Sequence, residues 1–554
     1  MLMRPRALSA LACLLLASAC ADPGGANEAA GGTAIVATPA DPDNLVPALA
    51  STTSAQAVVQ QLFDRLADLG DDLNTVGDKG FRPHLARSWT WSADSLSIAF
   101  HLAPRARWHD GQSVRAADVR FTFQLYSDPL TAAPFAPLLA NIDSVSVADS
   151  LTAVFWFKRR SSEQFFDATY QMLIHPVHLL GAVAHDSLRQ SPFARAPIGS
   201  GRFRFVEWEP KVKLVIASDT TNYAGRARLD RVVFATMPDP AAGVNRMLTR
   251  EVDVLDNVRP EMLAQFAGRA DVKTQPYALL SYGFVLFALH DNGTPRAHPL
   301  FGDRTLRRAI ARALDRPSFV HAVFDTSATV PVGPAPSSIA PKDTGLVQLP
   351  YNVAESDRLL DSLGWARGTD GMRARYGKPL AFTLLVPAPV RTRVRYATLI
   401  QAALKERGIT VNIESVEPAV FTERMSKRAF DAAMYGVGTD PTLSSIRQSW
   451  SGDGALTAGG TNHAGYANPV YDALVDSAMR AATLAERNAR FARAFRIIND
   501  DAPGIWLYDP RQVIALQARV QPTKLLAVGW FTGLADWTIP SGQRLPRDRA
   551  TGSK

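Results

Sequence analysis

The sequence predicts a mixed α/β protein built from more than one domain. Short runs rich in β-branched residues alternate with amphipathic helical segments along the whole chain, which is the pattern of an α/β architecture. The 554 residues correspond to about three or four domain-sized units. The apolar content of 47% is ordinary for a globular protein, and we find no internal repeat.

The first twenty residues have the order of a secretory signal peptide. Arg4 and Arg6 precede an apolar run at 7–16, and the small residues 17–19 lead into Cys20. A cysteine at this place resembles the lipid-attachment site of bacterial lipoproteins, so we expect residues 1–19 to be removed and Cys20 to be acylated. The alternative is cleavage after A-S-A without a lipid. The apolar run is too short to span a bilayer.

Composition limits the compartment and the partners. The only other cysteine, Cys13, lies in the leader, so the mature chain has no disulfide framework and no cysteine-based metal site. The small, glycine-rich residues 20–32 indicate a flexible tether. The formal charge of +8 falls to +6 without Arg4 and Arg6, and no block of five basic residues occurs, so nucleic acid is not an expected partner. We expect an extracytoplasmic body held at the membrane by its lipid.

In the first half of the chain, strands are predicted from β-branched runs or from alternating apolar residues, and helices from apolar residues three or four apart. The sequence W-T-W-S-A-D-S-L-S-I-A-F-H-L, ending at residue 102, alternates around a polar turn and predicts a hairpin. The other predicted strands are 33–38, 142–147, 151–157 and 231–236, and the predicted helices are 51–69, 116–126 and 241–248.

In the second half, helices and strands continue to alternate. Gly364 and Gly408 each follow an apolar helical pattern and are expected to end a helix. Residues 331–341 form a proline-rich loop. The predicted helices are 303–314, 354–363, 397–407 and 472–499, the last being mostly one long helix, and the predicted strands are 380–386 and 409–416.

Four motifs resemble chemical sites but fit structural roles better. Ser200 lies between two glycines, yet a nucleophile elbow needs glycine two residues earlier, where this chain has Ile. His109 lies in a W-H-D-G turn. Residues 371–379 lack both the spacing and the hydroxyl of a phosphate loop. His175 and His178 share one possible helix face but lack a fitting acid for a metal. We expect no catalytic residue, metal or cofactor.

Several longer stretches carry a family resemblance. They are L-A-R-S-W-T-W-S (85–92), F-H-L (100–102), W-H-D-G-Q-S-V-R-A-A-D-V-R-F-T-F (108–123), I-G-S-G-R-F (198–203), L-R-R-A-I-A-R-A-L-D-R (306–316), N-V-A-E-S-D-R-L-L-D-S-L-G-W (352–365), F-D-A-A-M-Y-G (430–436), G-Y-A-N-P-V-Y-D-A-L (465–474) and D-A-P-G-I-W-L-Y (501–508). Their order closely resembles the family 5 solute-binding proteins of ABC importers, the dipeptide, oligopeptide and nickel group, from about residue 33 to about residue 530.

The resemblance implies a two-lobed α/β fold of the periplasmic-binding-protein type (cluster C) with an extra inserted domain. Lobe I would comprise residues 33–65, 197–285 and 506–554, the inserted domain 66–196, and lobe II 286–505. It further implies a monomer that captures a small solute or peptide between hinged lobes. The closed form would then dock transiently on ABC permease and ATPase subunits.

The resemblance also places the ligand. In peptide-binding members an aspartate of G-W-x-A-D-Y-x-D-P grips the free amine, and here M-Y-G-V-G-T-D-P occupies 434–441, so that aspartate aligns with Val437. Since Val cannot pair with an ammonium group, a free-amine peptide is not favoured. Aromatic walls with a few polar groups suit a small concave site. The expected ligand contacts are Tyr282, Tyr435, Gly436, Gly438, Thr439, Asp440, Trp450, Asn462 and Tyr466.

Two other functions stay open at this point. A hydrolase of secreted substrates would need a nucleophile, a base and an orienting group, which a sequence can hide; turnover of peptides or esters by the pure protein would reveal it. A chaperone or sensor could use the same fold without an importer, and the absence of permease and ATPase genes beside this one would favour that function.

Overall fold

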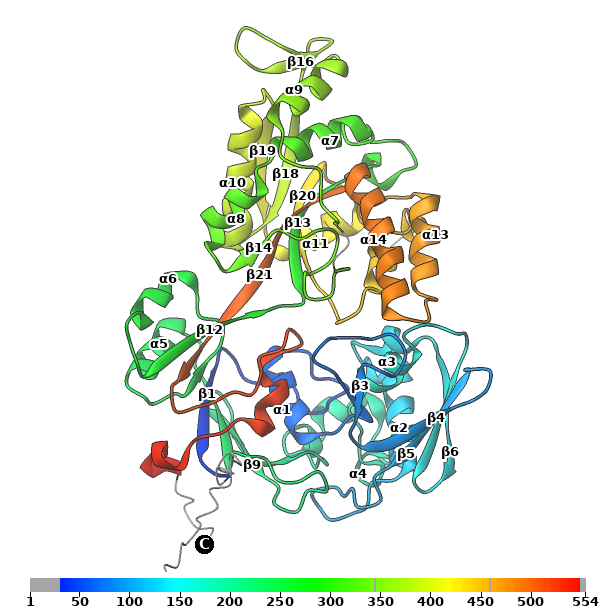
Figure 1. Ribbon diagram of the computed structural model, residues 1–554, viewed down its shortest axis with the longest axis vertical. Coiled ribbons are helices and arrows are strands. Elements are labelled where there is room, and N and C mark those ends of the chain that lie inside the picture. The colour runs from blue at the N-terminus through cyan, green and yellow to red at the C-terminus, as the bar shows by residue number, and fades with distance from the viewer. Residues whose placement is uncertain (1–29, 343–344, 458–459, 549–554) are drawn as a thin grey trace, which may run out of the picture.

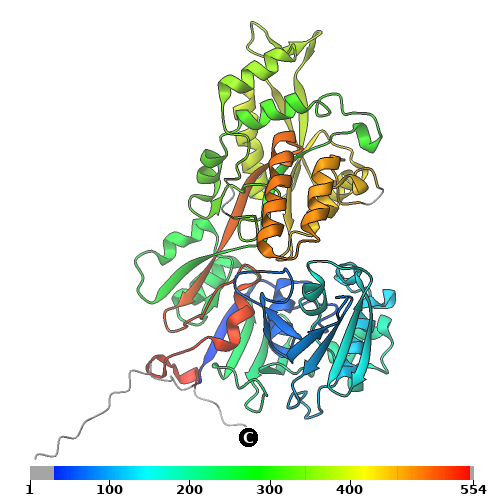
Figure 2. The ribbon, with the colours of Figure 1, turned by 45° about the vertical axis from the view of Figure 1, so that its right-hand side comes forward.

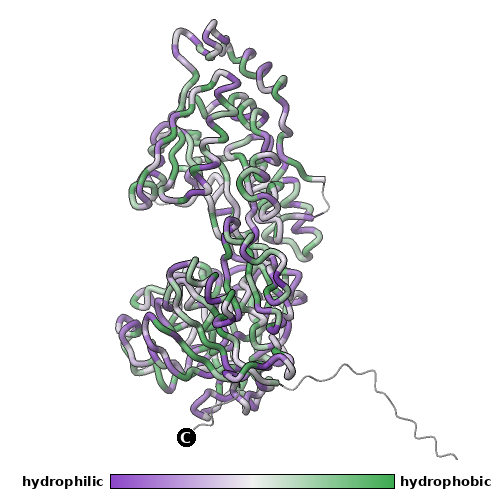
Figure 3. The backbone as a smooth tube through the Cα atoms, turned by 90° about the vertical axis from the view of Figure 1, so that its left-hand side faces the viewer, coloured by the Kyte–Doolittle hydropathy of each residue, from purple (hydrophilic) through white to green (hydrophobic). Residues whose placement is uncertain are grey.

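The computed structural model describes residues 30–342, 345–457 and 460–548. These residues form two bodies, one above the other in Figure 1, which meet across a narrow waist that is clear in Figure 3. We call the upper body lobe II; in the lower body we keep the names lobe I and inserted domain for the residues to which they were assigned from the sequence. Within these ranges no helix is long and apolar enough to cross a membrane. The predicted two-lobed α/β fold is confirmed.

Lobe I is built on one half of a large mixed sheet. β1 (Thr33–Thr38) lies parallel to β10 (Arg231–Thr236) and β11 (Val254–Leu255), while β9 (Lys213–Ser218) and β8 (Phe203–Glu209) extend the sheet in antiparallel fashion. β1 is buried along almost its whole length, which explains its unbroken run of small and β-branched residues. The helices of lobe I are α1 (Thr53–Leu62), α5 (Pro240–Leu248) and α6 (Pro260–Leu263).

The inserted domain has its own antiparallel sheet, in the order β4-β5-β7-β6. Its buried face is aromatic: Phe100 contacts Phe155 edge-on and Phe165 at 5.5 Å between ring centres. A short pair, β2 with β3, lies beside it. The elements are β2 (Ala67–Leu69), β3 (Phe81–Pro83), β4 (Ala86–Trp91), β5 (Ser97–Leu102), α2 (Ala116–Ser127), β6 (Ile142–Asp149), β7 (Thr152–Phe157), α3 (Gln164–Thr169) and α4 (Val177–Leu180).

Lobe II carries the other half of the large sheet, in the order β19-β18-β20-β13. Helices cover this half of the sheet in Figures 1 and 2, and a small three-stranded sheet lies at the far end of the lobe. The elements are β13 (Ser281–Phe287), α7 (Arg304–Ala313), α8 (Arg316–Phe324), β14 (Ala328–Thr329), α9 (Val353–Ser362), β15 (Ala366–Arg367), β16 (Arg373–Arg375), β17 (Lys378–Pro379), β18 (Ala381–Pro387), α10 (Arg391–Lys405), β19 (Thr410–Val416), α11 (Pro418–Lys427), β20 (Ala432–Gly438), α12 (Ser445–Trp450), α13 (Pro469–Ala478) and α14 (Leu484–Asp501).

Two strands carry the chain between the lobes. β12 (Val272–Ala278) pairs with the second part of β21 (Gly504–Gln517) in lobe I, and β13 pairs with the first part of β21 in lobe II. The crossing therefore lies at residues 279–280 and near Pro510, whereas the expected lobe boundary at 285–286 falls inside β13. Two neighbouring strands without other covalent links form a narrow hinge.

Most elements match the sequence-based expectations, but two helices were assigned too long. The helix expected at 51–69 ends at Leu62, and residues 67–69 form β2, in which Leu69 lies opposite Phe81 of β3 instead of on a helix face. The helix expected at 472–499 is two helices. Thr483 ends the break by accepting a hydrogen bond from the Glu486 amide at 3.2 Å, which starts α14.

Candidate ligand-binding site

An aromatic wall lies in lobe II where β13 and β20 approach the waist. Tyr282 and Phe284 are stacked on β13, with ring centres 5.3 Å apart, and Tyr435 of β20 meets Phe284 edge-on at 5.6 Å. Trp450, at the end of α12, packs against Phe284 and perpendicular to Trp506 at 5.1 Å. Each ring of the wall therefore packs against at least one other ring.

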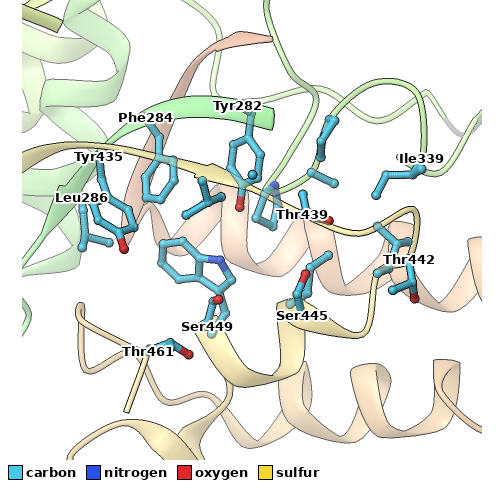
Figure 4. Close-up of a pocket in the computed structure, with 18 of the residues that line it drawn as sticks. Tyr282, Phe284, Leu286, Ile339, Tyr435, Thr439, Thr442, Ser445, Ser449 and Thr461 are labelled. Carbon is cyan, nitrogen blue, oxygen red and sulfur yellow. The ribbon is translucent and has the colours of Figure 1, made fainter. Parts of the chain in front are cut away.

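A cavity of about 140 Å³ opens beside this wall. Figure 4 shows Tyr282 and Phe284 on one side of it and Ser445 and Ser449 of α12 on the other. A protein cavity of about 150 Å³ can hold benzene. This cavity therefore suits one ring-sized or side-chain-sized group of a ligand. The hydroxyl groups on its lining belong to Tyr282, Tyr435, Thr439, Thr442, Ser445, Ser449 and Thr461.

The lining is uncharged at neutral pH. It includes no Asp, Glu, Lys or Arg among the residues that the structure describes. Burial raises the pKa of the Tyr282 phenol, and burial also raises that of Tyr435, so both hydroxyls keep their protons. Burial and nearby Arg428 lower the pKa of His463, the one titratable imidazole on the lining. A charged group entering here would lose its water without gaining a counter-ion.

A carboxylate lies just outside the cavity. The turn after β20 presents Thr439 and Thr442 to the cavity, whereas Asp440 lines a second, smaller cavity of about 100 Å³ with Arg65, Tyr170 and other residues of the lower body. Asp440 makes no ion pair in the described part of the chain. Burial is the main cause that raises the pKa of Asp440. This acid therefore faces the boundary between the lobes.

The lower body contributes two larger cavities. One, of about 580 Å³, lies between α1, the segment 255–262 and Trp530; the other, of about 560 Å³, lies between α1, β2 and the segment 523–536. Gln60 of α1 lines both of them and also the small cavity at Asp440. Spaces of several hundred Å³ are typical of ligand sites. Through Gln60, the lower-body cavities thus adjoin the small cavity that Asp440 of lobe II also lines.

The second of these cavities is strongly polar. His84 lies between two carboxylates, with Nε2 at 3.1 Å from Asp64 and Nδ1 at 2.9 Å from Asp68. Burial alone would lower the pKa of His84, but the facing Asp68 and Asp64 raise it well above its usual value. The imidazole is therefore a cation at neutral pH and offsets charge on this wall.

The structure brings together some of the predicted ligand contacts and separates others. Tyr282, Tyr435, Gly438, Thr439 and Trp450 line the 140 Å³ cavity, as does Val437, and Asp440 lines the neighbouring one. A Cβ on Gly436 would lie 2.8 Å from the guanidinium of Arg393, so this glycine does not face the cavity.

Asn462 and Tyr466 lie in the loop behind the cavity. The Asn462 amide donates to the carbonyls of Ser451 at 2.9 Å and Tyr466 at 2.8 Å, and its oxygen accepts from the Tyr466 amide. The Tyr466 hydroxyl donates to Asp501 at 2.7 Å. These bonds fix the course of the loop that supports Trp450.

The remaining motifs have structural partners. The His109 ring bridges the glycines on either side of Ser200, within 2.9 Å of the Gly201 carbonyl oxygen and 3.1 Å of the Gly199 amide nitrogen. His178 pairs with Asp110, while His175 is fully buried against Phe63. The two histidines expected on one helix face therefore serve different contacts. Cys20 lies outside the described residues.

Much of the site was not predicted from the sequence. The unpredicted residues are Phe284 and the hydroxyl-bearing residues of α12, and the α1 glutamines Gln56 and Gln60, whose side chains hydrogen bond at 3.0 Å. Gln56 and Gln60 are four residues apart and therefore share one face of α1, which was a usable signal for this wall. The hydroxyls of α12 carry no such pattern.

Known proteins resemble this chain both in sequence and in fold. The family model for bacterial extracellular solute-binding proteins, family 5, matches residues 80–455. The oligopeptide-binding protein AppA of Bacillus subtilis is 27% identical over 507 residues, which covers 89% of each chain. Protein XP55 of Streptomyces lividans is also 27% identical, over 487 residues, covering 86% of this chain and 84% of that protein.

Solved structures agree in fold. The structure of Bacillus subtilis AppA in complex with a nonapeptide has a TM-score of 0.72 at 23% identity and covers 92% of this chain and 99% of that one. The substrate-binding protein CtaP of Listeria monocytogenes has a TM-score of 0.78 at 21% identity, covering 92% and 100%. Because the family model spans more than half of the sequence, the chain belongs to the bacterial extracellular solute-binding proteins of family 5.

Proposed function

We propose that this protein captures a peptide-like solute between its lobes outside the cytoplasm and delivers it to an ABC permease and its ATPase subunits. The observation that carries the proposal is the uncharged aromatic cavity of lobe II, whose lining residues Thr439 and Thr442 flank Asp440. Asp440 in turn lines a small cavity together with Gln56 and Gln60 of α1 in lobe I. Oligopeptide-binding relatives in the same family support a peptide-like ligand. The protein acts as a monomer, tethered by a lipid on Cys20.

The chemistry of the cavity defines what part of the solute it takes. Val437 stands among aromatic rings and hydroxyls, so an ammonium group placed beside it would stay unpaired. An apolar or aromatic side chain fits this space, and backbone groups of a peptide find hydroxyl partners at Thr439 and Ser449. A free amine is therefore not required for binding, and Asp440, on the same turn as Thr439, is an acid that a cationic group of the solute can pair with.

Capture follows from the hinge. A solute that touches lobe II alone in the open form gains contacts with α1 of lobe I only when the lobes close, so binding shifts the population toward the closed form. The crossing strands at 279–280 and near Pro510 let the lobes rotate without breaking either half of the sheet. The role is binding and transfer, not turnover.

Thermal shift measurements with matched peptides test the proposal. The mature protein is titrated with a tripeptide that has a central Phe and a free amine, and with its N-acetylated amide. A compound that binds only the folded state at 100 times its Kd stabilises it by about 2.7 kcal/mol. We expect both peptides to raise the Tm equally. Strong selectivity for free amines would contradict the reading of Val437, and mass spectrometry of co-purifying compounds would identify the natural solute.

A further inference from the structure

A buried polar cluster joins the two bodies at the edge of the waist away from the hinge. Glu163, at the start of α3 in the inserted domain, accepts hydrogen bonds from Thr75 at 2.9 Å and from Arg487 of α14 at 3.0 Å. Thr442 of lobe II donates to the same carboxylate oxygen. Arg487 also donates to Thr75 at 2.6 Å. We call Thr75, Glu163, Thr442 and Arg487 the interlobe clamp.

The clamp joins residues of the two bodies. Thr75 and Glu163 belong to the inserted domain, while Thr442 and Arg487 belong to lobe II. Beside the clamp, the Ser162 amide and hydroxyl both donate to the Met479 carbonyl at 3.0 Å. In Figure 1 the lower ends of α14 and α13 lie above α3, far from the crossing of β12 and β21. The two bodies are thus held at opposite edges, by strands at one and by the clamp at the other.

Burial makes the clamp sensitive to the loss of one partner. The side chains of Glu163 and Arg487 are 3% and 4% exposed. Removing one member of such a pair leaves the other as an uncompensated buried charge. If both partners lay in one core, the remaining charge would be hydrated only when that core unfolds. Here the partners lie on different bodies, so separation of the lobes is enough to hydrate it. A broken clamp should therefore shift the protein toward the open form while each lobe stays folded.

One residue of the clamp also touches the candidate ligand site. Thr442 lines the 140 Å³ cavity and donates its hydroxyl hydrogen to Glu163. A group that fills the cavity therefore contacts the turn that closes the clamp. We propose that Glu163 is a positioning residue for ligand capture, which holds lobe II closed over an occupied site through Thr442 and Arg487. The part of this inference that concerns ligand binding rests on the proposed function. The part that concerns closure of the lobes does not.

The test of closure compares Glu163→Gln with the wild-type protein by small-angle X-ray scattering without added peptide. The matched control is Glu414→Gln, which makes the same chemical change at the Glu414–Arg424 pair (2.6 Å) inside lobe II. We expect a larger radius of gyration for Glu163→Gln and no change for Glu414→Gln, with unchanged circular dichroism in both. An unchanged radius for Glu163→Gln, or an equal increase in the control, would overturn the inference.

A second variant keeps the test decisive if Glu163→Gln does not fold. Thr442→Val keeps the ion pair and removes only the hydroxyl of lobe II, and we expect a smaller increase of the radius in the same direction. The double variant Glu163→Gln/Arg487→Met removes both charges, so it should be no more open than Arg487→Met alone. A double variant more open than Arg487→Met would contradict a charge-pair clamp.

The test of ligand binding uses the N-acetylated, Phe-containing tripeptide amide as the probe in stopped-flow experiments. Its dissociation from Glu163→Gln should be about tenfold faster than from wild type, a difference of about 1.4 kcal/mol, with association changed less than twofold. Equal dissociation rates would overturn the coupling. If the probe binds neither protein while Glu163→Gln still opens the lobes, the proposed peptide function fails and the clamp stands.

Discussion

Acid should weaken this protein through one buried histidine. His175 is fully buried, its ring stacks near Phe63 at 6.1 Å and meets Tyr126 edge-on, and burial lowers its pKa to about 3 from the ordinary 6.5. The folded protein therefore keeps His175 neutral where the unfolded chain takes up a proton. Its contribution to stability is complete above pH 6.5 and is lost as the pH falls toward 3.

The size of the effect follows from these two values. Each pH unit between them is worth about 1.4 kcal/mol, so a fall from pH 6.5 to pH 5 should cost about 2 kcal/mol of the free energy of unfolding. The variant His175→Gln cannot take up the proton and retains an acceptor for the Ala48 amide, which donates to His175 Nε2 at 3.4 Å in the wild type. The variant should lack this part of the pH dependence.

Urea unfolding at pH 7.5 and pH 5 measures the difference. We expect the wild type to lose about 2 kcal/mol more than His175→Gln between the two pH values. His321→Gln is the control, because His321 is 79% exposed and pairs with Asp325 on the surface. The reasoning would be refuted if wild type and His175→Gln lost the same stability, or if His321→Gln reproduced the effect.

Three further predictions address the cavity, the hinge and the anchor. Val437→Asp should place a carboxylate in the uncharged cavity. Calorimetry should then show that the variant binds the free-amine tripeptide at least about tenfold more tightly than its N-acetylated amide, a difference of about 1.4 kcal/mol. An equal preference in Val437→Asn would contradict a charge effect. Gly283→Ala should lower the Tm of lobe II, because a Cβ there would lie 2.1 Å from the ring of Tyr508, and overpacking costs about 1–3 kcal/mol. Gly438→Ala, where the nearest atom is 3.9 Å away, should leave the Tm near that of wild type, and an equal loss in both variants would count against the clash. Cys20→Ser should move the protein from the membrane fraction to the soluble fraction, and a variant that stays membrane-bound would disprove the lipid anchor.

The sequence was informative about elements and less so about their ends. An unbroken run of small and β-branched residues located β1 at Thr33–Thr38, which is buried on both faces. Alternation located the pair β4 and β5, because one buried face leaves a period of two. It did not separate a helix from the following strand near Leu66, since apolar residues at helical spacing also suit a strand that pairs locally. The break before α14 had a readable signal, because Thr483 and Glu486 have the spacing of a helix cap.

The site was only partly visible in the sequence for a physical reason. Tyr282 and Val437 are opposite each other in the β13–β20 pair, a relation that depends on register and not on sequence distance. The clamp is a stronger case: Thr75 and Arg487 hydrogen bond across 412 positions of the chain. No local pattern marks such a contact, because its members meet only after both bodies have folded and docked.

The place of β21 has a consequence for the order of folding. This strand lies between β13 and β11 in the large sheet, so it joins the two halves, yet it is made only after about nine-tenths of the chain. Until residues 504–517 emerge from the ribosome, the sheet remains two separate fragments with exposed edges. In any chain that is exported before it folds, such a late central strand would delay the final topology until export is complete.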